Sequence, residues 1–87
     1  MNNKHHSMTL EIVSLGKIEF QEPISSFTVK TKNGEVTILD HHRPIVSQLV
    51  SGSAKIVRQN GEERHLEISG GFLEVSDENK LVVLLSR

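Results

Sequence analysis

An Asn-Gly pair at residues 33 and 34, flanked by alternating apolar residues, is the feature that most restricts what this chain can fold into. A type I′ turn needs positive φ at both central residues, and Asn-Gly tolerates this well. A two-residue loop at this pair sets three cross-strand pairs: Lys32 with Glu35, Thr31 with Val36, and Val29 with Ile38. Apolar groups then meet apolar groups and a lysine meets a glutamate, so the sequence predicts a β-hairpin centred on Asn33-Gly34.

A second such pair, Asn60-Gly61, predicts a different loop, because a two-residue loop there would place apolar Ile56 opposite His65. Adding one residue repairs the alternation by placing Ile56 opposite Leu66. We therefore predict a hairpin whose loop has three or more residues, or an adjacent bulge. Four glycines at such turns and breaks are expected to be structural: Gly34, Gly61, Gly70 and Gly71.

Other short segments alternate in the same way or are continuously apolar, which predicts further strands. They are Leu10–Ile12 and Ile18–Phe20, joined tightly at Gly16, then Ile24–Lys30, Phe72–Val75 and Leu81–Leu85, with a turn at Ser76–Asn79. Leu81–Leu85 is apolar on both faces, so we expect it to be internal or covered. His41–Ser51 is too short and too rich in Val and Ile for a stable helix, which predicts irregular structure or a weak strand.

Composition supports an all-β fold class. The chain has nine Val, seven Ile and four Thr but one Ala, and β-branched residues favour strands whereas Ala-poor chains make poor helices. Roughly eight short strands at even spacing indicate a β-sandwich or a flattened barrel. The 87 residues leave room for one domain, which we place at residues 9–87. Residues 1–8 are interpreted as a disordered leader or the remnant of an added tag.

Charge and hydropathy exclude several classes of function. Ten Lys and Arg balance eleven Asp and Glu without any positive cluster, which argues against binding to nucleic acid or to an anionic membrane surface. The longest apolar stretch is far short of the roughly 20 residues that span a bilayer. No cysteine is present, so disulfides and thiolate metal sites are excluded. We expect a soluble chain without a nucleic-acid role.

The residues carry no recognisable catalytic pattern. The sequence has no phosphate loop, no nucleophile elbow and no GxGxxG motif. Its carboxylates mostly alternate with apolar residues, as solvated strand faces do, and none stands out as one of an acid–base pair. We therefore expect no catalytic residues, no metal and no cofactor, and an interaction module is the better hypothesis.

The histidines leave one alternative open. His41 and His42 are adjacent, so on an extended chain their rings point to opposite faces, and a metal site would need His65 or a carboxylate as well. The alternative is a stand-alone β-sandwich or cupin-like module that binds a metal or small ligand through His41, His42 and His65. The chain is shorter than a usual cupin and lacks a His-x-His pair, which lowers this option.

Three motifs occur in a set order along the chain. They are Asn33-Gly34-Glu35-Val36-Thr37-Ile38-Leu39, then His42-Arg43-Pro44-Ile45, then Ile68-Ser69-Gly70-Gly71-Phe72-Leu73-Glu74-Val75, followed by a turn and an apolar strand. Together they resemble the epsilon subunit of F-type ATP synthases, in its N-terminal β-sandwich domain, over about Thr9 to Ser86. In that family a Gly-Glu-hydrophobic-Gly-Ile-Leu-Pro-Gly-His-x-Pro run precedes Ser-Gly-Gly-hydrophobic-hydrophobic-Glu-Val.

The resemblance implies a β-sandwich of about ten short, mostly antiparallel strands. It also implies a non-catalytic rotor subunit in the central stalk of a proton- or sodium-transporting ATP synthase, which contacts the gamma subunit and the ring of c subunits. Such a subunit helps to couple ion transport to ATP synthesis. It lies at the cytoplasmic face of the bacterial plasma membrane, peripheral to the membrane through the complex only.

The resemblance also assigns roles by position. Lys32, Asn33, Gly34 and Glu35 match the turn that faces the c ring, with Glu35 at the acidic position, where we expect it to pair with an Arg of the ring. His42 and Pro44 match the His-x-Pro segment near the gamma interface.

The sequence also departs from the family pattern. Asp40 and His41 stand where the family usually has Pro-Gly, and Thr37 stands where it often has Gly. Family members commonly continue into a C-terminal pair of helices that in many bacteria restrains ATP hydrolysis. This sequence ends at Arg87, which leads us to expect a short form without that inhibitory hairpin.

Overall fold

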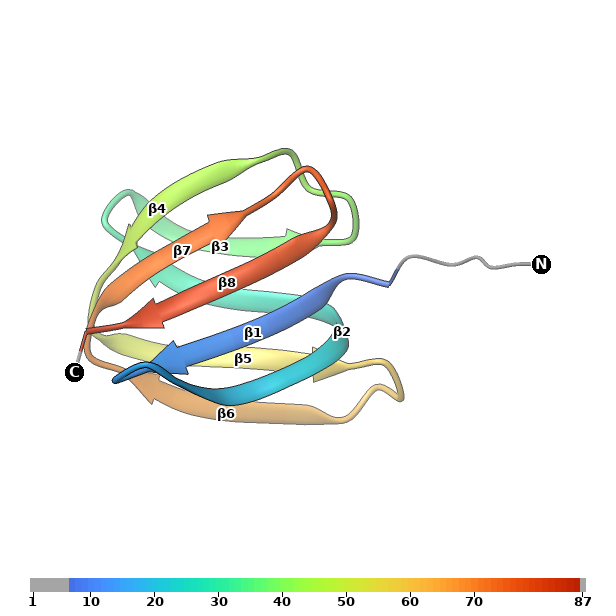
Figure 1. Cartoon of the computed structure of the whole chain (residues 1–87), viewed down its shortest axis with the longest axis horizontal. Helices are drawn as coiled ribbons and strands as arrows, with labels where there is room; N and C mark the ends of the chain where they lie inside the picture. The colour runs from blue at the N-terminus through green and yellow to red at the C-terminus, as the bar shows by residue number, and fades with distance from the viewer. Residues whose placement is uncertain (1–6, 87) are drawn as a thin grey trace.

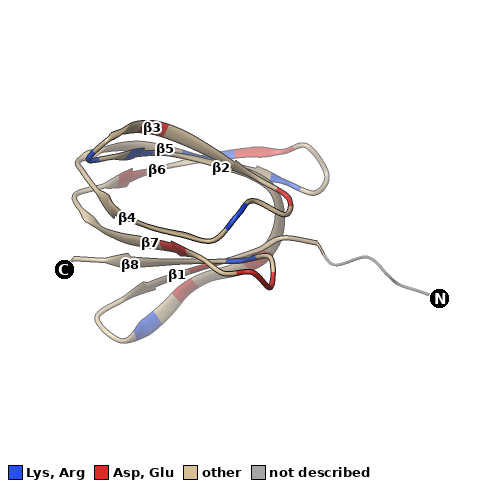
Figure 2. Cartoon of the chain, turned by 90° about the horizontal axis from the view of Figure 1, so that it is seen from above, with Lys and Arg blue, Asp and Glu red and all other residues tan. Residues whose placement is uncertain are grey.

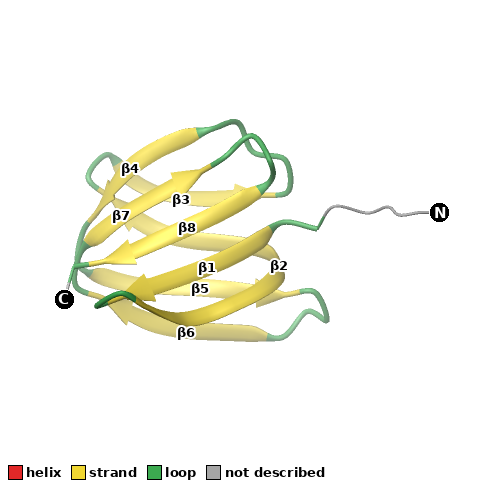
Figure 3. Cartoon of the chain, in the orientation of Figure 1, coloured by secondary structure: helices red, strands yellow, loops and turns green. Residues whose placement is uncertain are grey.

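The computed structural model describes residues 7–86, which form eight strands and no helix (Figure 1, Figure 3). The strands are β1 (Thr9–Ser14), β2 (Lys17–Thr31), β3 (Gly34–Leu39), β4 (Ile45–Leu49), β5 (Gly52–Arg58), β6 (Glu63–Ile68), β7 (Gly71–Val75) and β8 (Lys80–Leu85). The all-β prediction is confirmed. The described residues include no helix with the length and hydropathy needed to cross a bilayer.

The strands pack as two layers that share β2. One layer has the order β1–β8–β7–β4, and the other has the order β3–β2–β5–β6 (Figure 2). Neighbouring strands are antiparallel except β1 and β8, which run parallel. The predicted β-sandwich of mostly antiparallel strands is confirmed, with eight strands in the described residues as the residue pattern indicates, and not the ten that the family resemblance implies.

β2 joins the two layers because it is one long strand where the sequence predicts two. Its first half pairs with β1, and its second half pairs with β3 and β5. The change of partner falls just after Pro23, which has no N–H to donate, and the register shifts between Ile24 and Ser26. The strand bends around the edge of the sandwich here, as corner strands do (Figure 1).

The core lies between the layers and is made by the inward-facing residues of every strand. Its fully buried side chains include Leu10, Phe27, Ile56 and Val83. Met8 also belongs to the core: the sequence places it in the leader, but its side chain is fully buried and its carbonyl accepts a hydrogen bond from the Ile24 amide. Ser7 of the predicted leader is also described, whereas residues 1–6 lie outside the described residues.

The first predicted hairpin forms, but its register is wrong by two residues. Thr31 pairs with Gly34 and Lys30 with Glu35, so Lys32 and Asn33 make the loop. Gly34 has a φ of 116°, whereas Asn33 is not among the residues with positive φ, so the turn is not type I′. Thr31 closes it instead, because its Oγ1 accepts the Asn33 amide at 3.1 Å and donates to the Gly34 carbonyl at 2.7 Å.

The second hairpin has the predicted longer loop. The Gly61 amide donates to the Arg58 carbonyl at 2.9 Å, and the Arg58 amide donates to the Glu62 carbonyl at 2.8 Å, which leaves three residues in the loop. The register again differs from the prediction by two, since Ile56 pairs with Arg64 and not with Leu66. A two-residue turn with positive φ at both positions, as in type I′, occurs instead between β1 and β2, at Leu15 and Gly16, whose φ values are 51° and 76°.

The C-terminal half of the chain follows the sequence prediction closely. β8 is internal, since it pairs with β1 on one side and β7 on the other. Ser76–Asn79 forms the turn before it, closed by the Ser76 amide and the Lys80 carbonyl at 2.9 Å. His41–Ser51, for which the sequence predicts irregular structure or a weak strand, contains the short strand β4, which pairs with β7.

Candidate functional site

The four residues predicted to meet the c ring form an exposed turn at one end of the sandwich. Lys32, Asn33, Gly34 and Glu35 all lie on the surface. The turn is held to the neighbouring strand, because the Lys32 amide donates to the carbonyl of Gln48 on β4 at 2.9 Å. Glu35 leaves the turn opposite Lys30 on β2, not opposite Lys32 as predicted. The charged side chains of Lys32 and Glu35 therefore stand on a backbone that hydrogen bonds hold in place.

The residues predicted to meet the gamma subunit lie at the opposite end of β3, in the loop that leads to β4. His42 is half-buried, its Nδ1 lies 2.7 Å from the Arg43 carbonyl oxygen, and its amide donates to the Leu39 carbonyl at 3.2 Å. Pro44 is exposed and begins the approach to β4. The two predicted contact regions are thus separate surfaces, one at each end of β3 (Figure 1).

The three histidines of the alternative hypothesis are not gathered into one site. His41 and His42 lie in the loop between β3 and β4, whereas His65 lies on β6, opposite Lys55. The Nε2 of His65 is 3.5 Å from Oε1 of Glu63. Within residues 7–86, no group of three or more His, Asp or Glu side chains is arranged to hold a metal ion.

The four predicted structural glycines all have positive φ. Gly71 is the most constrained, because a Cβ added there would lie 2.0 Å from the Leu84 carbonyl oxygen. The same addition at Gly34 would meet nothing within 4 Å. Gly71 therefore permits the close approach of β7 to β8, whereas Gly34 serves only the backbone geometry of its turn.

A surface that the sequence analysis indicated only through the two-sided strand Leu81–Leu85 lies on the outer side of the β1–β8–β7–β4 layer. The register places four apolar residues in one row across four strands: Ile18 on β2, Val13 on β1, Leu84 on β8 and Phe72 on β7. Val82 and Val46 lie in the next row, where Glu74 separates them. We call these six residues the apolar face. The signal that could have found it is the second apolar side of Leu81–Leu85.

The apolar face is exposed enough to be a binding surface. The exposed fractions are 57% for Ile18, 52% for Phe72, 50% for Leu84 and 71% for Val46. Scattered apolar residues are normal on a protein surface, but a contiguous group across neighbouring strands marks an interaction site. The apolar face is therefore the strongest candidate for protein–protein contact.

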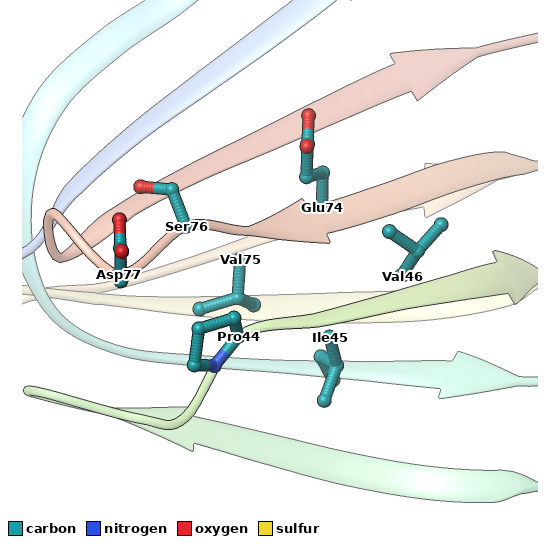
Figure 4. A pocket seen from close by; sticks show the side chains of 7 residues that line it. All are labelled: Pro44, Ile45, Val46, Glu74, Val75, Ser76 and Asp77. Atoms are coloured by element: carbon teal, nitrogen blue, oxygen red, sulfur yellow. The ribbon is translucent and has the colours of Figure 1, made fainter.

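An open groove of about 510 Å³ borders the apolar face where β4 begins and β7 ends (Figure 4). Its lining residues are Pro44, Ile45, Val46, Glu74, Val75, Ser76 and Asp77. The charged side chains among them are the carboxylates of Glu74 and Asp77, while Pro44 and Val46 are apolar and exposed. The groove joins the predicted gamma-contact loop to the apolar face and suits an apolar partner that carries positive charge.

Comparison with known proteins identifies the family of this fold. The family model described as ATP synthase, Delta/Epsilon chain, beta-sandwich domain matches residues 7–87. The ATP synthase epsilon chain of Natranaerobius thermophilus is 37% identical over 76 residues, which cover 86% of this chain and 53% of the relative. That of Nitratidesulfovibrio vulgaris is 40% identical over 78 residues, covering 90% of this chain and 57% of the relative. The chain thus spans about half the length of the curated relatives it matches.

Solved structures agree with this family. A chain of the Euglena gracilis mitochondrial ATP synthase, from a structure of OSCP, F1 and the c ring, matches with a TM-score of 0.88 and 26% identity. The match covers 99% of this chain and 54% of that one. A chain from the central stalk and c ring of the Tetrahymena thermophila enzyme shares the fold, with a TM-score of 0.80 at 20% identity, covering 98% and 67%. Fold, motif order and sequence agree: the chain belongs to the delta/epsilon family of ATP synthase subunits and corresponds to its β-sandwich domain.

Proposed function

We propose that this chain is a non-catalytic rotor subunit of a bacterial-type F-type ATP synthase. In this role it binds the gamma subunit and the c ring, and so helps to couple ion translocation to ATP synthesis. The observation that carries the proposal is the match of residues 7–87 to the β-sandwich domain of the family. The subunit then lies at the cytoplasmic face of the plasma membrane and is attached to the membrane through the complex.

The gamma subunit binds the apolar face and the groove beside it. Burial of Phe72 and Leu84 supplies the apolar part of the contact, since aromatic and large aliphatic side chains dominate binding energy at interfaces. Glu74 and Asp77 on the groove select a partner that places Lys or Arg opposite them. His42 and Pro44 extend the same surface along the loop that borders the groove.

The c ring meets the turn made by Lys32, Asn33, Gly34 and Glu35. The hydrogen bonds of Thr31 and Lys32 hold this turn in one geometry, so little conformational entropy is lost when a partner binds. Glu35 is exposed and available for a charge-assisted contact with an Arg of the ring.

Copurification with the gamma subunit of the same organism tests the gamma contact. The two chains are mixed at micromolar concentration and separated by size exclusion, with each chain alone as the reference. We expect one stable complex that contains both chains. If the chains elute separately at this concentration, the proposed gamma contact is wrong.

The c-ring contact is tested in membranes reconstituted with the subunit. Glu35→Gln removes the charge of the turn, and Glu67→Gln makes the same chemical change on exposed β6 as a matched control. We expect Glu35→Gln to lower ATP-driven ion pumping relative to ATP hydrolysis, and Glu67→Gln to leave the ratio unchanged. Equal ratios for wild type and Glu35→Gln would remove Glu35 from the c-ring contact.

A further inference from the structure

One buried side chain ties together three segments that are distant in sequence. Asn79 belongs to the turn between β7 and β8, and only 6% of its surface is exposed. Its Oδ1 accepts the amide of His41 at 2.7 Å, and its Nδ2 donates to Oδ1 of Asp40, also at 2.7 Å. Its main-chain carbonyl accepts the amide of Thr9 on β1 at 3.2 Å. Asn79 thus links the loop after β3 to the turn before β8 and to the start of β1.

These contacts fall where the loop backbone is unusual. His41 has a φ of 58°, in the left-handed region that few residues other than glycine adopt readily. A conformation of this kind persists only where the surroundings determine it. The carboxamide of Asn79 does so by satisfying the amide of His41 while it binds the carboxylate one residue earlier. Asn79 itself has a φ of 61°, which asparagine tolerates better than most residues.

The residues that Asn79 holds are next to the proposed gamma surface on both sides. Pro44 begins one wall of the groove, three residues after His41, and Asp77 ends the other wall, two residues before Asn79. The carboxamide is therefore a hydrogen-bonded bridge between the segments that carry the two walls.

We infer that Asn79 is a positioning residue of the gamma-binding surface, which holds the His42–Pro44 loop against the β7–β8 turn through the amide of His41 and the carboxylate of Asp40. This inference rests on the proposed gamma contact. A surface ordered before it meets its partner loses less entropy on binding, so release of the bridge lowers affinity even when the core is intact.

The bridge can be broken and rebuilt without change of size. Asn79→Asp places a second carboxylate at the position of the Nδ2 group, against Asp40, and aspartate still tolerates positive φ. The double variant Asp40→Asn/Asn79→Asp exchanges the amide and the carboxylate. The amide of Asn at position 40 then donates to the carboxylate of Asp at position 79, which still accepts the His41 amide. The net charge equals that of the wild type.

Affinity for the gamma subunit is measured for the wild type and each variant, with thermal unfolding in parallel. We expect Asn79→Asp to weaken binding by about tenfold or more, and the double variant to return to within about threefold of the wild type. Ile56→Val, which removes a buried methyl group on β5 in the other layer of the sandwich, serves as a stability control. It should lower the unfolding temperature yet leave the affinity within about threefold of the wild type.

The outcomes separate the two proposals. If wild type binds and Asn79→Asp binds equally well, the inference is wrong and the gamma contact stands. If the double variant does not recover affinity, the hydrogen-bonded bridge is not the cause of the loss. If Ile56→Val loses as much affinity as Asn79→Asp, the effect of Asn79 is one of stability alone and the inference is wrong. If wild type does not bind, the gamma contact fails first and the inference falls with it.

Discussion

Phe72 on β7 lies directly opposite Leu84 on β8, and about half of each side chain is exposed, at 52% and 50%. The pair faces away from the core, so it contributes little to the burial that stabilises the sandwich. Two large apolar side chains paired on an outer face are typical of a surface that becomes buried in a complex. This arrangement separates binding from folding and allows each to be tested alone.

The double variant Phe72→Gln/Leu84→Gln should bind the gamma subunit at least about tenfold more weakly, because truncating a side chain that matters at an interface costs about 1 kcal/mol or more. Its free energy of unfolding should stay within about 0.5 kcal/mol per substitution of the wild type, as exposed positions usually do. Titration calorimetry and urea denaturation measure the two quantities. Glu67→Gln on β6 is the control, and wild-type affinity in the double variant would exclude the apolar face from the contact.

Alanine at two glycines should have different costs. Gly71→Ala should destabilise the fold by about 3 kcal/mol or more, because its Cβ would lie 2.0 Å from the Leu84 carbonyl oxygen and β7 would have to move away from β8. Gly34→Ala has open space and should cost only about 1 kcal/mol from its φ of 116°. Urea denaturation of both variants checks the order, and equal costs would contradict the steric explanation.

Leu15→Asn should stabilise the protein. Leu15 is 81% exposed and has a φ of 51°, so it combines an exposed apolar side chain with a backbone conformation that favours Asn or Gly. We expect a gain of about 0.5–1 kcal/mol in the free energy of unfolding. The matched change Gly16→Ala, at a φ of 76°, should lower stability, and a loss of stability in Leu15→Asn would show that Leu15 makes a contact that holds the turn.

Substitutions of Arg58 on β5 can show whether its ion pairs or its packing contribute more to the free energy of unfolding. Its guanidinium lies 3.1 Å from Glu22 and 3.2 Å from Glu62, and its Cζ lies 5.9 Å from the centre of the Phe20 ring. Partly exposed ion pairs usually contribute less than about 1 kcal/mol, whereas a long aliphatic stem covers apolar surface.

Arg58→Met, which keeps an unbranched apolar stem, should therefore cost less than about 1 kcal/mol. Arg58→Ala should cost more, at about 1–2 kcal/mol, because the cover over Phe20 is also lost. Thermal unfolding at low and high salt measures both. Equal losses for the two variants would mean that the charge carries the effect.

The two hairpins show what sequence could predict about this fold. Both predicted registers differ from the observed ones by two residues, and because side chains alternate with period two, each residue still faces the side it was expected to face. The core could therefore be predicted while the exact pairs could not. In the first hairpin Gly34 is the first residue of β3, whereas in the second Gly61 is the last residue of the loop. The pattern of apolar residues does not indicate either position.

The candidate site, too, could be predicted from the sequence only in part. The motifs predict contact roles for Lys32–Glu35 and His42–Pro44, because both stand in ordered runs of residues along the chain, and these roles stay predictions. The second apolar side of Leu81–Leu85 indicates Leu84, but the full row from Ile18 to Phe72 could not be predicted. The row depends on β1 and β8 being neighbours, and these strands are the first and the last in sequence order. A bulge between Ile12 and Val13 also brings Ile18 opposite Val13, which strict alternation does not indicate.

The parallel pairing of β1 with β8 also bears on how the protein is made. Proteins are synthesised from the N-terminus to the C-terminus, so β1 leaves the ribosome before the other strands of this domain. Its second edge stays unpaired until β8 follows, about 70 residues later. The β2–β3 and β5–β6 hairpins can form during this time, because their strands are neighbours in sequence. During synthesis the second edge of β1 is therefore the strand edge that waits longest for its partner among the described pairings.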